Sequence, residues 1–453
     1  MRRMTAGDIV AATAGTMLSG SAETVICEIG TDSRAVNKGM LFIPLAGERF
    51  DGHDYIESAL NKGAAAVLTH KDLDFKTDKC VIRVGDTLTA LGDIARFYKN
   101  KYSVPTVAVT GSVGKTTTKD MIYAALASQK KTLKTMENYN NNIGLPKTLF
   151  NLNDEHELAV VEMGMNHFGE IDYLASIANP DIAVITNIGM SHIENLGSRE
   201  GIFKAKTEIT RGFTEKNTLI VNGDDDYLKT LKSGAPYKVV TYGISGCDVY
   251  AKNITDNGLK GIEFTAVADG AEYAVKVNVP GEHNVYNALA AICVSRELGL
   301  DIPKAIAGIE NMTLTANRLE IEDINGVTVI KDYYNASPSS VRAALKILST
   351  EKRRRKAAVL GDILEMGEYA KDAHYALGAD VMNSGADFLI TAGENAKYIA
   401  DGARDGGMKN VKSFDTTDAA AEAVKREIKD GDVVLIKASH GMKFEKIYNA
   451  IRS

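Results

Sequence analysis

The sequence lacks the features that mark several broad classes of protein. Its four cysteines are scattered without C-x-x-C pairing, which argues against a disulfide framework or a zinc site. No stretch approaches the roughly 18 apolar residues of a membrane span, and no apolar segment follows Arg2 and Arg3 as in a secretion signal. Internal repeats, low-complexity segments and heptad runs are also missing. We therefore expect a cytoplasmic protein with reduced thiols and no membrane span.

The chain also has no excess of positive charge, because its 59 acidic residues outnumber its 53 lysines and arginines. The formal net charge is −6 at pH 7, which argues against a general nucleic-acid binder. Hydrophobic residues make up 45% of the chain and charged residues 25%, as in soluble globular enzymes. A length of 453 residues is too great for one ordinary core and suggests about three domains. We expect a monomeric enzyme that binds no nucleic acid.

Short apolar strands alternate with helical stretches along the whole chain. Residues 1–102 are expected to form a small α/β domain, and the polar segment that follows them ends in Pro105. Residues 103–313 form the expected central domain with a mostly parallel sheet, and residues 314–453 form a third, Rossmann-like α/β domain. Within the central domain, the alternating pattern of residues 238–280 predicts a small antiparallel element appended to that sheet. The predicted fold class is therefore α/β with three domains.

The run VAVTGSVGKTTTK, residues 107–119, carries the most chemical information. A short apolar strand leads into a turn where Gly111 and Gly114 can adopt backbone angles closed to other residues, so successive N–H groups can surround phosphate oxygens. Lys115 adds positive charge, and the Thr116 hydroxyl is placed to reach Mg²⁺. The full pattern G-x-x-x-x-G-K-[ST] needs a glycine two positions before Gly111, where this chain has valine. The loop is thus a shortened form, and it favours phosphate binding over a structural turn.

Two further polar residues follow apolar strands of the same expected domain. Glu162 ends the strand in LAVVEMGMNH, and His192 follows the next strand in ITNIGMSHIENLG. Open α/β sheets bind ligands at the carboxyl ends of their strands, so both residues are candidates for metal binding or catalysis. Alternatively, both residues have a structural role: the Glu162 carboxylate accepts hydrogen bonds from loop amides, and His192 bonds only to its protein neighbours. Their place beside a phosphate loop favours a functional role.

Other polar residues have two readings from local chemistry alone. Lys204 and Lys206 lie on a predicted helix, where lysines ordinarily face solvent. The amide cluster at residues 138–142 either binds a substrate or forms a polar turn. Asp332, at a strand end, either binds ribose hydroxyls or belongs to the cap of the following helix. The residues themselves leave these alternatives open.

Taken together, these segments resemble the Mur ligase family, and within it the branch that adds D-alanyl-D-alanine to UDP-N-acetylmuramoyl-tripeptide. The likeness spans essentially the whole chain, and ordered motifs across three domains are more specific than any one of them. The motifs are TDSR at 31–34, GSVGKTTTK at 111–119, NYNNNIGLP at 138–146, EMGMNHFGEI at 162–171, TNIGMSHIENLGS at 186–198, KAKTEI at 204–209, GEHNVYNALAA at 281–291, NRLE at 317–320, DYYNASP at 332–338, LGDILEMGE at 360–368 and KASHGMKFEKI at 437–447.

The resemblance implies an ATP-dependent amide ligase of peptidoglycan precursor synthesis. In such a ligase the tripeptide carboxylate attacks the γ-phosphate of ATP, and the amine of D-alanyl-D-alanine then displaces phosphate from the acyl phosphate. Phosphorylation supplies a good leaving group, and cations offset the crowding of negative charge. The implied partners are ATP, one or two Mg²⁺ ions, UDP-N-acetylmuramoyl-tripeptide and D-alanyl-D-alanine.

The resemblance also implies catalytic and metal-binding roles. The implied catalytic residues are Lys115, Glu162, His192 and Lys206. Lys206 matches the lysine that many Mur ligases carbamylate, which turns a cation into a metal-binding carbamate. Thr116 and Glu162 would contact one Mg²⁺, and His192 would belong to a second metal site. The implied metal ligands are therefore Thr116, Glu162, His192 and Lys206.

Nucleotide and substrate contacts follow from the same resemblance. Asn287 would contact adenine, Arg318 the phosphates and Asp332 the ribose. The implied ATP-binding residues are Gly111, Ser112, Val113, Gly114, Lys115, Thr116, Thr117, Asn287, Arg318 and Asp332. The implied substrate-binding residues are Ser33 and Arg34 at a uridine-nucleotide site, with Asn138, Asn141 and Asn142 near the reacting centre.

The chain departs from the family pattern at a few positions. Val113 replaces the Asn often found in the phosphate loop, and Tyr333 and Ser337 replace the usual Ser and Asn of the DSYNANP segment. His440 stands where the family commonly has Arg in GSRG. Histidine offers less charge and fewer donors than arginine, so no substrate contact is assigned to residue 440.

Three other functions compete with this one. A Mur ligase that adds a different residue and a folylpolyglutamate-type ligase would share the fold, while a nucleotide-binding scaffold protein would keep the phosphate loop without turnover. The segments LGDILEMGE and DYYNASP favour the dipeptide-adding branch. The scaffold is disfavoured by the joint presence of Lys115, Glu162, His192 and Lys206. Whether the tripeptide ends in lysine or meso-diaminopimelate is open.

Overall fold

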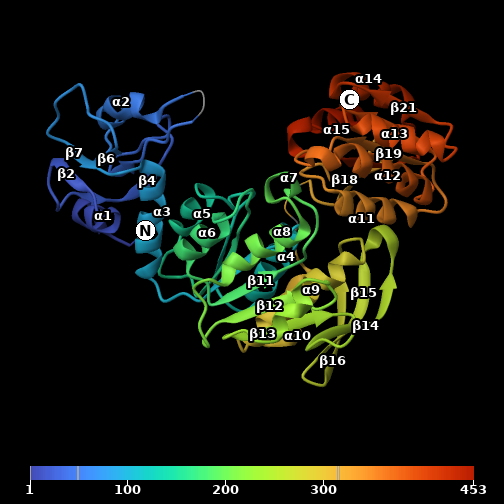
Figure 1. Ribbon diagram of the computed structural model, residues 1–453, viewed down its shortest axis with the longest axis horizontal. Helices are drawn as coiled ribbons and strands as arrows, with labels where there is room; N and C mark the ends of the chain where they lie inside the picture. The colour runs from blue at the N-terminus through green and yellow to red at the C-terminus, as the bar shows by residue number, and fades with distance from the viewer. Residues whose placement is uncertain (1, 48–49, 314, 316) are drawn as a thin grey trace.

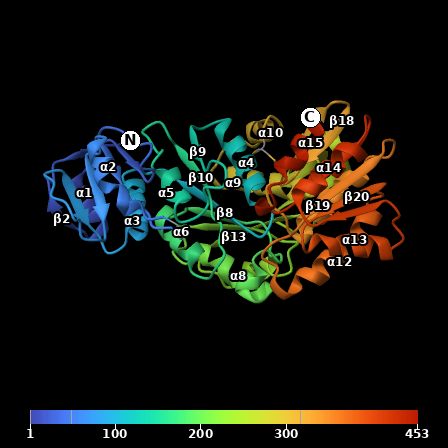
Figure 2. The ribbon, with the colours of Figure 1, turned by 90° about the horizontal axis from the view of Figure 1, so that it is seen from above.

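The computed structural model describes residues 2–47, 50–313, 315 and 317–453. Three α/β bodies follow one another along the chain, each built around its own sheet (Figure 1). We call them the N-terminal, central and C-terminal domains. Viewed from above, the central domain lies between the other two (Figure 2). Within the described ranges, no helix combines the length and the apolar character needed to cross a membrane.

The N-terminal domain is built on a five-stranded sheet of order β2-β7-β6-β5-β4, in which only β2 runs antiparallel to its neighbour. Helix α3 is amphipathic and joins this domain to the next, because the Tyr98 hydroxyl donates to the carbonyl of Leu152 at 2.7 Å. The elements are β1 (Met4–Thr5), α1 (Ala6–Thr13), β2 (Thr16–Ser19), β3 (Val25–Ile26), β4 (Glu28–Gly30), β5 (Met40–Phe42), η1 (Gly52–Tyr55), α2 (Ile56–Asn61), β6 (Ala66–Thr69), β7 (Cys80–Arg83) and α3 (Thr87–Asn100).

The central domain is built on a nine-stranded sheet of order β16-β15-β14-β13-β12-β11-β8-β10-β9. Strand β8 lies third from one edge, between β11 and β10, and is buried on both faces, as parallel strands covered by helices usually are. The elements are β8 (Thr106–Thr110), α4 (Lys115–Ala127), β9 (Thr132–Lys134), α5 (Gly144–Leu149), β10 (Leu158–Glu162), α6 (Glu170–Ala178), β11 (Ile182–Ile185), α7 (Ile193–Leu196), α8 (Arg199–Thr207), η2 (Glu208–Thr210), β12 (Thr218–Asn222), η3 (Leu228–Lys232), β13 (Lys238–Gly243), β14 (Val249–Asp256), η4 (Gly258–Lys260), β15 (Ile262–Ala268), β16 (Ala271–Val277), α9 (His283–Glu297) and α10 (Ile302–Glu310).

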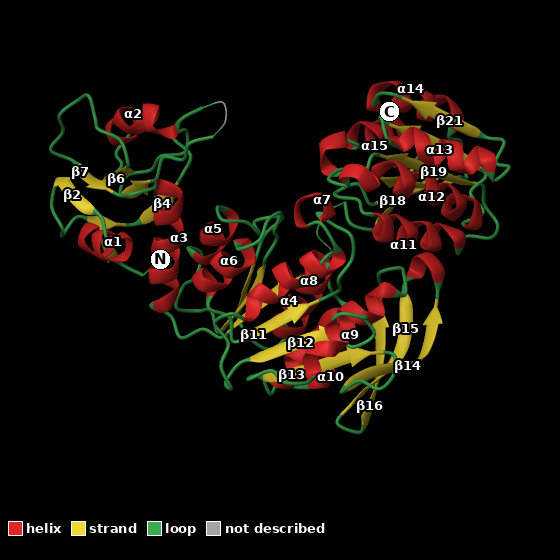
Figure 3. Cartoon of the chain, in the orientation of Figure 1, coloured by secondary structure: helices red, strands yellow, loops and turns green. Residues whose placement is uncertain are grey.

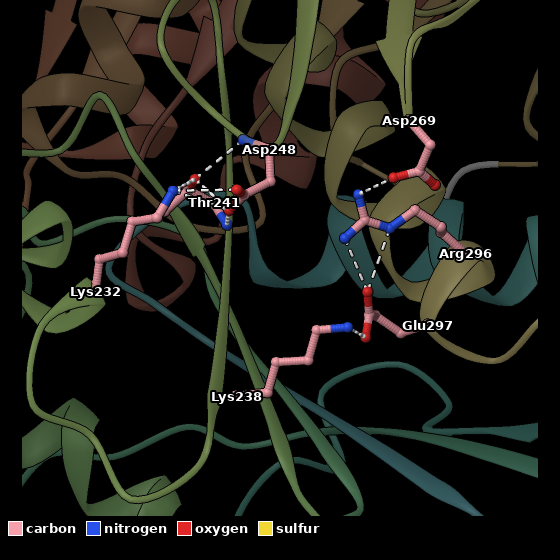
Figure 4. Close-up of polar contacts among 7 residues, drawn as sticks. All are labelled: Lys232, Lys238, Thr241, Asp248, Asp269, Arg296 and Glu297. Carbon is pink, nitrogen blue, oxygen red and sulfur yellow. Dashed lines mark hydrogen bonds and ion pairs between the residues drawn. The ribbon is translucent and has the colours of Figure 1, made fainter.

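Strand β13 corrects part of the prediction for residues 238–280. It pairs in parallel with β12 and with the start of β14, so only β14, β15 and β16 form the expected antiparallel element. Polar contacts hold β13 at both ends (Figure 4): the Thr241 N–H donates to Asp248 at 2.8 Å, and Lys238 pairs with Glu297 of α9 at 2.6 Å. Alternation of apolar and polar residues indicates a half-buried strand but not the direction of the neighbouring strand. The antiparallel prediction was therefore wrong for β13.

The C-terminal domain has a six-stranded sheet of order β17-β18-β22-β19-β20-β21, parallel except for β17, with helices on both faces (Figure 3). Helices α11, α12 and α13 pack on one face, and α14 and α15 on the other. The elements are β17 (Glu320–Ile324), β18 (Val327–Lys331), α11 (Pro338–Ser349), β19 (Lys356–Gly361), η5 (Gly367–Tyr369), α12 (Ala370–Asn383), β20 (Phe388–Ala392), α13 (Ala396–Asp405), β21 (Val411–Phe414), α14 (Thr417–Glu427), β22 (Val433–Lys437), η6 (His440–Met442) and α15 (Glu445–Arg452).

The expected domain boundaries fall in segments that connect these bodies. The boundary after residue 102 lies between α3 and β8, and the boundary after residue 313 lies between α10 and β17. Leu314, the first residue of the expected third domain, lies outside the described residues. The exact positions of both boundaries stay predictions.

Candidate active site

A cavity of about 1070 Å³ lies between the central and C-terminal domains. The loops after β8, β10 and β11 and the start of α9 form its central wall, and the segment after β18 together with Lys437 forms its C-terminal wall. The sheet places the carboxyl ends of neighbouring parallel strands at one edge, where α/β proteins bind their ligands. The cavity is therefore where the chemistry is expected.

The turn between β8 and α4 has a backbone that only glycine fits at Gly111. This residue has φ +147°, and a Cβ atom there would lie 1.9 Å from Oγ1 of Thr186. Asn187, after β11, braces the turn on both sides: its Oδ1 accepts from the Val113 N–H at 3.0 Å, and its amide donates to the Val113 carbonyl at 2.9 Å. The turn opens a 13-residue helix whose first N–H groups have no intrahelical partner. Such a helix end is a ready site for a phosphate group.

Lys115 lies at the first position of α4 and folds back over the turn. Its ammonium group donates to the Gly111 carbonyl at 2.7 Å. Burial lowers the pKa of Lys115, and the nearby Glu162 carboxylate opposes that shift. The lysine is thus held over the loop by its own backbone, within reach of any phosphate the loop binds.

Glu162 is 1% exposed and holds two partners at the end of β10. Its Oε2 accepts from the Thr116 hydroxyl at 2.8 Å, and its Oε1 accepts from the Asn140 amide at 2.8 Å. A carboxylate and a hydroxyl in contact are hard oxygen ligands of the kind that Mg²⁺ prefers. Sequence reasoning missed Asn140 as an individual residue, although it lies inside the amide cluster that was singled out.

Lys206 overturns the default expectation of an exposed lysine on α8. The side chain is 1% exposed, and among the described residues its ammonium group forms no ion pair or hydrogen bond. Burial and the nearby charge of Lys115 lower the pKa of Lys206 well below its usual range, which favours the neutral amine. By contrast, Lys204 on the same helix faces solvent and pairs with Glu200 at 2.7 Å. A buried amine without an acid beside it is unusual, because burial of an unpaired charge is costly.

His192 follows β11 and also lines the cavity. Its Nδ1 lies 2.5 Å from Oε2 of Glu365, which comes from the C-terminal domain. This contact, with burial opposing it, lowers the pKa of Glu365. Glu365 lies within the LGDILEMGE motif, but no sequence pattern pairs it with His192, because the two residues are far apart along the chain.

The other predicted nucleotide contacts lie on both walls. Asn287, on α9, accepts from the Thr118 hydroxyl at 2.9 Å and so lies against the phosphate-loop helix. The guanidinium of Arg318 stacks on the ring of Tyr334, 4.2 Å from its centroid. Asp332 pairs with the buried Lys437 at 2.6 Å, and burial raises the pKa of this aspartate while the lysine opposes the shift. The cavity therefore brings these three residues together with the phosphate loop.

The predicted substrate residues divide into two groups. Asn138, Asn141 and Asn142 line the cavity, and Asn141 also accepts from the N–H groups of Ile143 and Gly144 at the start of α5. Ser33 and Arg34 lie in the N-terminal domain, after β4, and line no part of this cavity. The Arg34 side chain is 89% exposed and pairs with Asp32 at 2.8 Å. His440 is likewise exposed and outside the cavity, beside the ring of Tyr334.

The implied metal ligands fit a cation only in part. Across the described ranges, no group of three or more histidine, cysteine, aspartate or glutamate side chains could hold a metal ion. Thr116 and Glu162 supply two oxygens, and the unpaired amine of Lys206 is the remaining candidate ligand once it carries a carboxyl group. The donor set is therefore compatible with Mg²⁺, and a carbamate would complete it.

Comparisons with known proteins bear on all three domains. Residues 25–99 match the Mur ligase family, catalytic domain; residues 109–295 match the Mur ligase middle domain; and residues 317–440 match the Mur ligase, glutamate ligase domain. UDP-N-acetylmuramoyl-tripeptide--D-alanyl-D-alanine ligase from Bacillus subtilis is 42% identical over 429 residues, which cover 94% of this chain and 93% of that protein. The protein of the same name from Escherichia coli is 32% identical over 437 residues, 95% of each chain.

Two solved structures resemble this chain over nearly its whole length. The crystal structure of MurF from Acinetobacter baumannii has a TM-score of 0.92 and 31% identity, and it covers 100% of this chain and 99% of its own. MurF ligase from Thermotoga maritima, solved in complex with ADP, has a TM-score of 0.84 and 29% identity over 94% of this chain and 97% of its own. Three matched domains in order and a relative at 42% identity lead to one conclusion. The chain belongs to the Mur ligase family.

Proposed function

We propose that the chain is an ATP-dependent amide ligase that joins D-alanyl-D-alanine to UDP-N-acetylmuramoyl-tripeptide, a step in the synthesis of peptidoglycan precursors. The relatives that carry this activity in their names align with more than nine tenths of the chain. The observation that carries the proposal is the meeting, in one cavity, of the phosphate loop, the Thr116–Glu162 pair and the walls of two domains. A ligase of two large substrates and ATP needs such a shared site.

The phosphate loop and the C-terminal wall together account for nucleotide binding. Residues 111–117 bind the triphosphate, with backbone N–H groups and Lys115 as the donors. Asn287 contacts adenine, Arg318 the phosphates and Asp332 the ribose. Lys437 holds Asp332 in place through the 2.6 Å ion pair. Nucleotide binding therefore requires both domains.

Four residues would hold the metal: Thr116, Glu162, His192 and Lys206. Thr116 and Glu162 would hold one Mg²⁺, His192 would belong to a second metal site, and a carbamate on Lys206 would supply further oxygen ligands. Mg²⁺ held there would neutralise charge on the phosphate oxygens and on the leaving ADP. Carbamate formation needs an uncharged amine, and burial lowers the pKa of Lys206, which favours that form. Asn140 keeps the Glu162 carboxylate in a fixed position through its 2.8 Å hydrogen bond.

The reaction follows from the charges that the cavity brings together. The terminal carboxylate of the tripeptide attacks the γ-phosphorus, and the bond to ADP breaks. The amine of D-alanyl-D-alanine then attacks the acyl phosphate, loses a proton and expels inorganic phosphate. Lys115 is the chain's own cation at this centre, and it offsets repulsion between the carboxylate and the triphosphate. Asn138, Asn141 and Asn142 bind the substrate near the reacting carboxylate.

The remaining assignments complete the proposal. Ser33 and Arg34 bind the uridine nucleotide in the N-terminal domain, which spans residues 1–102, and the central and C-terminal domains span residues 103–313 and 314–453. We propose that the enzyme acts as a monomer in the cytoplasm.

Phosphate release tests the proposed function. Purified full-length protein is incubated with ATP, Mg²⁺ and UDP-N-acetylmuramoyl-tripeptide, with and without D-alanyl-D-alanine. We expect phosphate release to depend on the dipeptide, and Lys115→Ala to abolish it. Release that ignores the dipeptide would contradict the proposal, and ATP binding without any release would favour a scaffold protein instead.

A further inference from the structure

Asp120 is a buried carboxylate on α4, the helix that begins at the phosphate loop. It lies about one turn after Thr116 and is 1% exposed. Its Oδ1 accepts a hydrogen bond from the ammonium group of Lys134 at 2.9 Å and forms an ion pair with Lys119 at 3.0 Å. A buried charge is costly unless it is paired, and two lysines of the central domain supply that pairing.

The second oxygen of Asp120 contacts a different part of the chain. Oδ2 accepts from the backbone N–H of Thr315 at 3.1 Å and from the Thr315 hydroxyl at 2.6 Å. We call these two hydrogen bonds the linker contact, because Thr315 lies between α10 of the central domain and β17 of the C-terminal domain. The charge of Asp120 is already balanced by its two lysines, so charge pairing does not require the linker contact.

Helix α4 also holds the element that precedes Thr315. Helix α10 packs closely on α4, because a Cβ atom at Gly308 would lie 2.3 Å from the carbonyl oxygen of Ala124. The phosphate loop therefore lies at the N-terminal end of α4, while α10 and Thr315 contact the same helix farther along. Any movement of Thr315 away from α4 is a movement relative to the phosphate loop.

The linker contact restricts the position of Arg318. The guanidinium of Arg318 stacks on the ring of Tyr334 and lines the cavity together with the phosphate loop. A chain advances at most about 3.6 Å per residue, so the Cα atoms of Thr315 and Arg318 lie within about 11 Å of each other. A residue fixed at position 315 therefore limits where the guanidinium at position 318 can lie.

We propose that Asp120 is a positioning residue that holds Thr315 against the phosphate-loop helix and thereby places Arg318 at the phosphates of a bound nucleotide. Asp120 acts on nucleotide affinity at a distance, since neither it nor Thr315 is among the described residues that line the cavity. The inference rests on the proposed function only in that it assigns a nucleotide to the cavity and Arg318 to its phosphates.

The test uses Thr315→Val, which keeps the branched shape of the side chain and removes the hydroxyl donor. Thr313→Val is the matched control, because it changes an exposed threonine two positions away. Thr315→Ser is a second control that keeps the hydroxyl. The readout is the dissociation constant of ADP with Mg²⁺, measured by titration calorimetry on the full-length protein without tripeptide or dipeptide. Urea unfolding of each variant measures stability separately.

We expect Thr315→Val to weaken ADP binding about 3- to 10-fold, which corresponds to the loss of one ordinary hydrogen bond. Thr313→Val and Thr315→Ser should bind ADP as the unmodified protein does. Asp120→Asn should weaken binding in the same direction as Thr315→Val. Because the linker contact acts through Arg318, Thr315→Val should have no further effect on ADP affinity in an Arg318→Ala background.

Two results would overturn the role of Asp120. One is equal ADP affinity in Thr315→Val and Thr313→Val. The other is an effect of Thr315→Val that has the same size with and without Arg318, because the threonine would then act independently of the arginine. An unmodified protein that binds no ADP would instead contradict the nucleotide site of the proposed function, and with it the role of Arg318.

Discussion

The central wall and the C-terminal wall of the cavity hold their polar side chains in different ways. On the central wall, Glu162 is 1% exposed, and contacts within the same domain fix the phosphate loop. On the C-terminal side, Glu365 lies outside the cavity lining, is half-exposed and makes its contact across the domain interface. The comparison teaches that the central domain carries a rigid phosphate site by itself, whereas the complete reacting centre exists only while both domains are in contact. Changes to the two walls should therefore affect different properties.

The largest expected effect comes from Lys206. Lys206→Ala removes the buried amine, and with it the carbamate, so we expect turnover to fall by about 1,000-fold or more. Short-chain carboxylic acids added to the assay should restore part of the activity by filling the place of the carbamate. The measurement is phosphate release in the presence of both substrates.

Lys204→Ala is the control for Lys206. It removes an exposed lysine two positions away on the same helix, together with one surface ion pair. We expect its turnover to match that of the unmodified enzyme, because exposed ion pairs contribute little. Equal activities of Lys206→Ala and the unmodified enzyme would refute the carbamate assignment.

The next largest effect should come from Gly111, and it tests the rigidity of the central wall. In Gly111→Ala the new Cβ atom would meet Oγ1 of Thr186 at 1.9 Å while the backbone stays at φ +147°. We expect the free energy of unfolding to fall by about 2–4 kcal/mol and nucleotide affinity to fall with it. Urea unfolding and nucleotide titration measure the two quantities.

Gly212→Ala provides the matched control for Gly111. Gly212 is exposed, has no positive φ, and a Cβ atom there would meet nothing within 4 Å. Its substitution should leave both stability and nucleotide affinity unchanged. If Gly111→Ala behaved in the same way, the turn would not be as rigid as the structure indicates.

The smallest effect concerns acid sensitivity at the contact between the walls. Burial, reinforced by the charges of Lys437 and Lys346, lowers the pKa of His283 from 6.5 to about 4. Between these values the unfolded chain binds a proton that the native chain does not, so stability should fall as the pH drops from 6.5 towards 4. The loss attributable to His283 is at most about 3 kcal/mol. Urea unfolding at several pH values measures how the free energy of unfolding changes with pH. In His283→Gln this change should be smaller between pH 6.5 and pH 4. An equal change in the variant would exclude His283 as the source of the acid sensitivity.

The central wall was also the easier one to predict from the sequence. The glycine spacing and Lys-Thr pair at residues 111–116 determine the loop, because few other residues tolerate its backbone. Strand periodicity gave the positions of Glu162 and His192 at strand ends. Periodicity could not give the parallel pairing of β13, since a strand's own side chains do not encode its neighbour's direction.

Residues that depend on tertiary contacts were beyond local reasoning. Composition places Lys204 and Lys206 together as exposed lysines, and only the packing of α8 separates them. The amide cluster was visible, but the sequence did not say that Asn140 is the member that contacts Glu162. Glu365 meets His192 from another domain, so no motif spacing could pair them.

The central claim is that the cavity activates a carboxylate rather than directing water at the γ-phosphate. The most direct measurement uses UDP-N-acetylmuramoyl-tripeptide with ¹⁸O in both oxygens of the reacting carboxylate, together with ATP, Mg²⁺ and D-alanyl-D-alanine. Mass spectrometry then follows the label in the products. Attack of the carboxylate on phosphorus predicts one ¹⁸O atom in each released phosphate and the other in the new amide. Phosphate without ¹⁸O would contradict the account, because the oxygen would then have come from water.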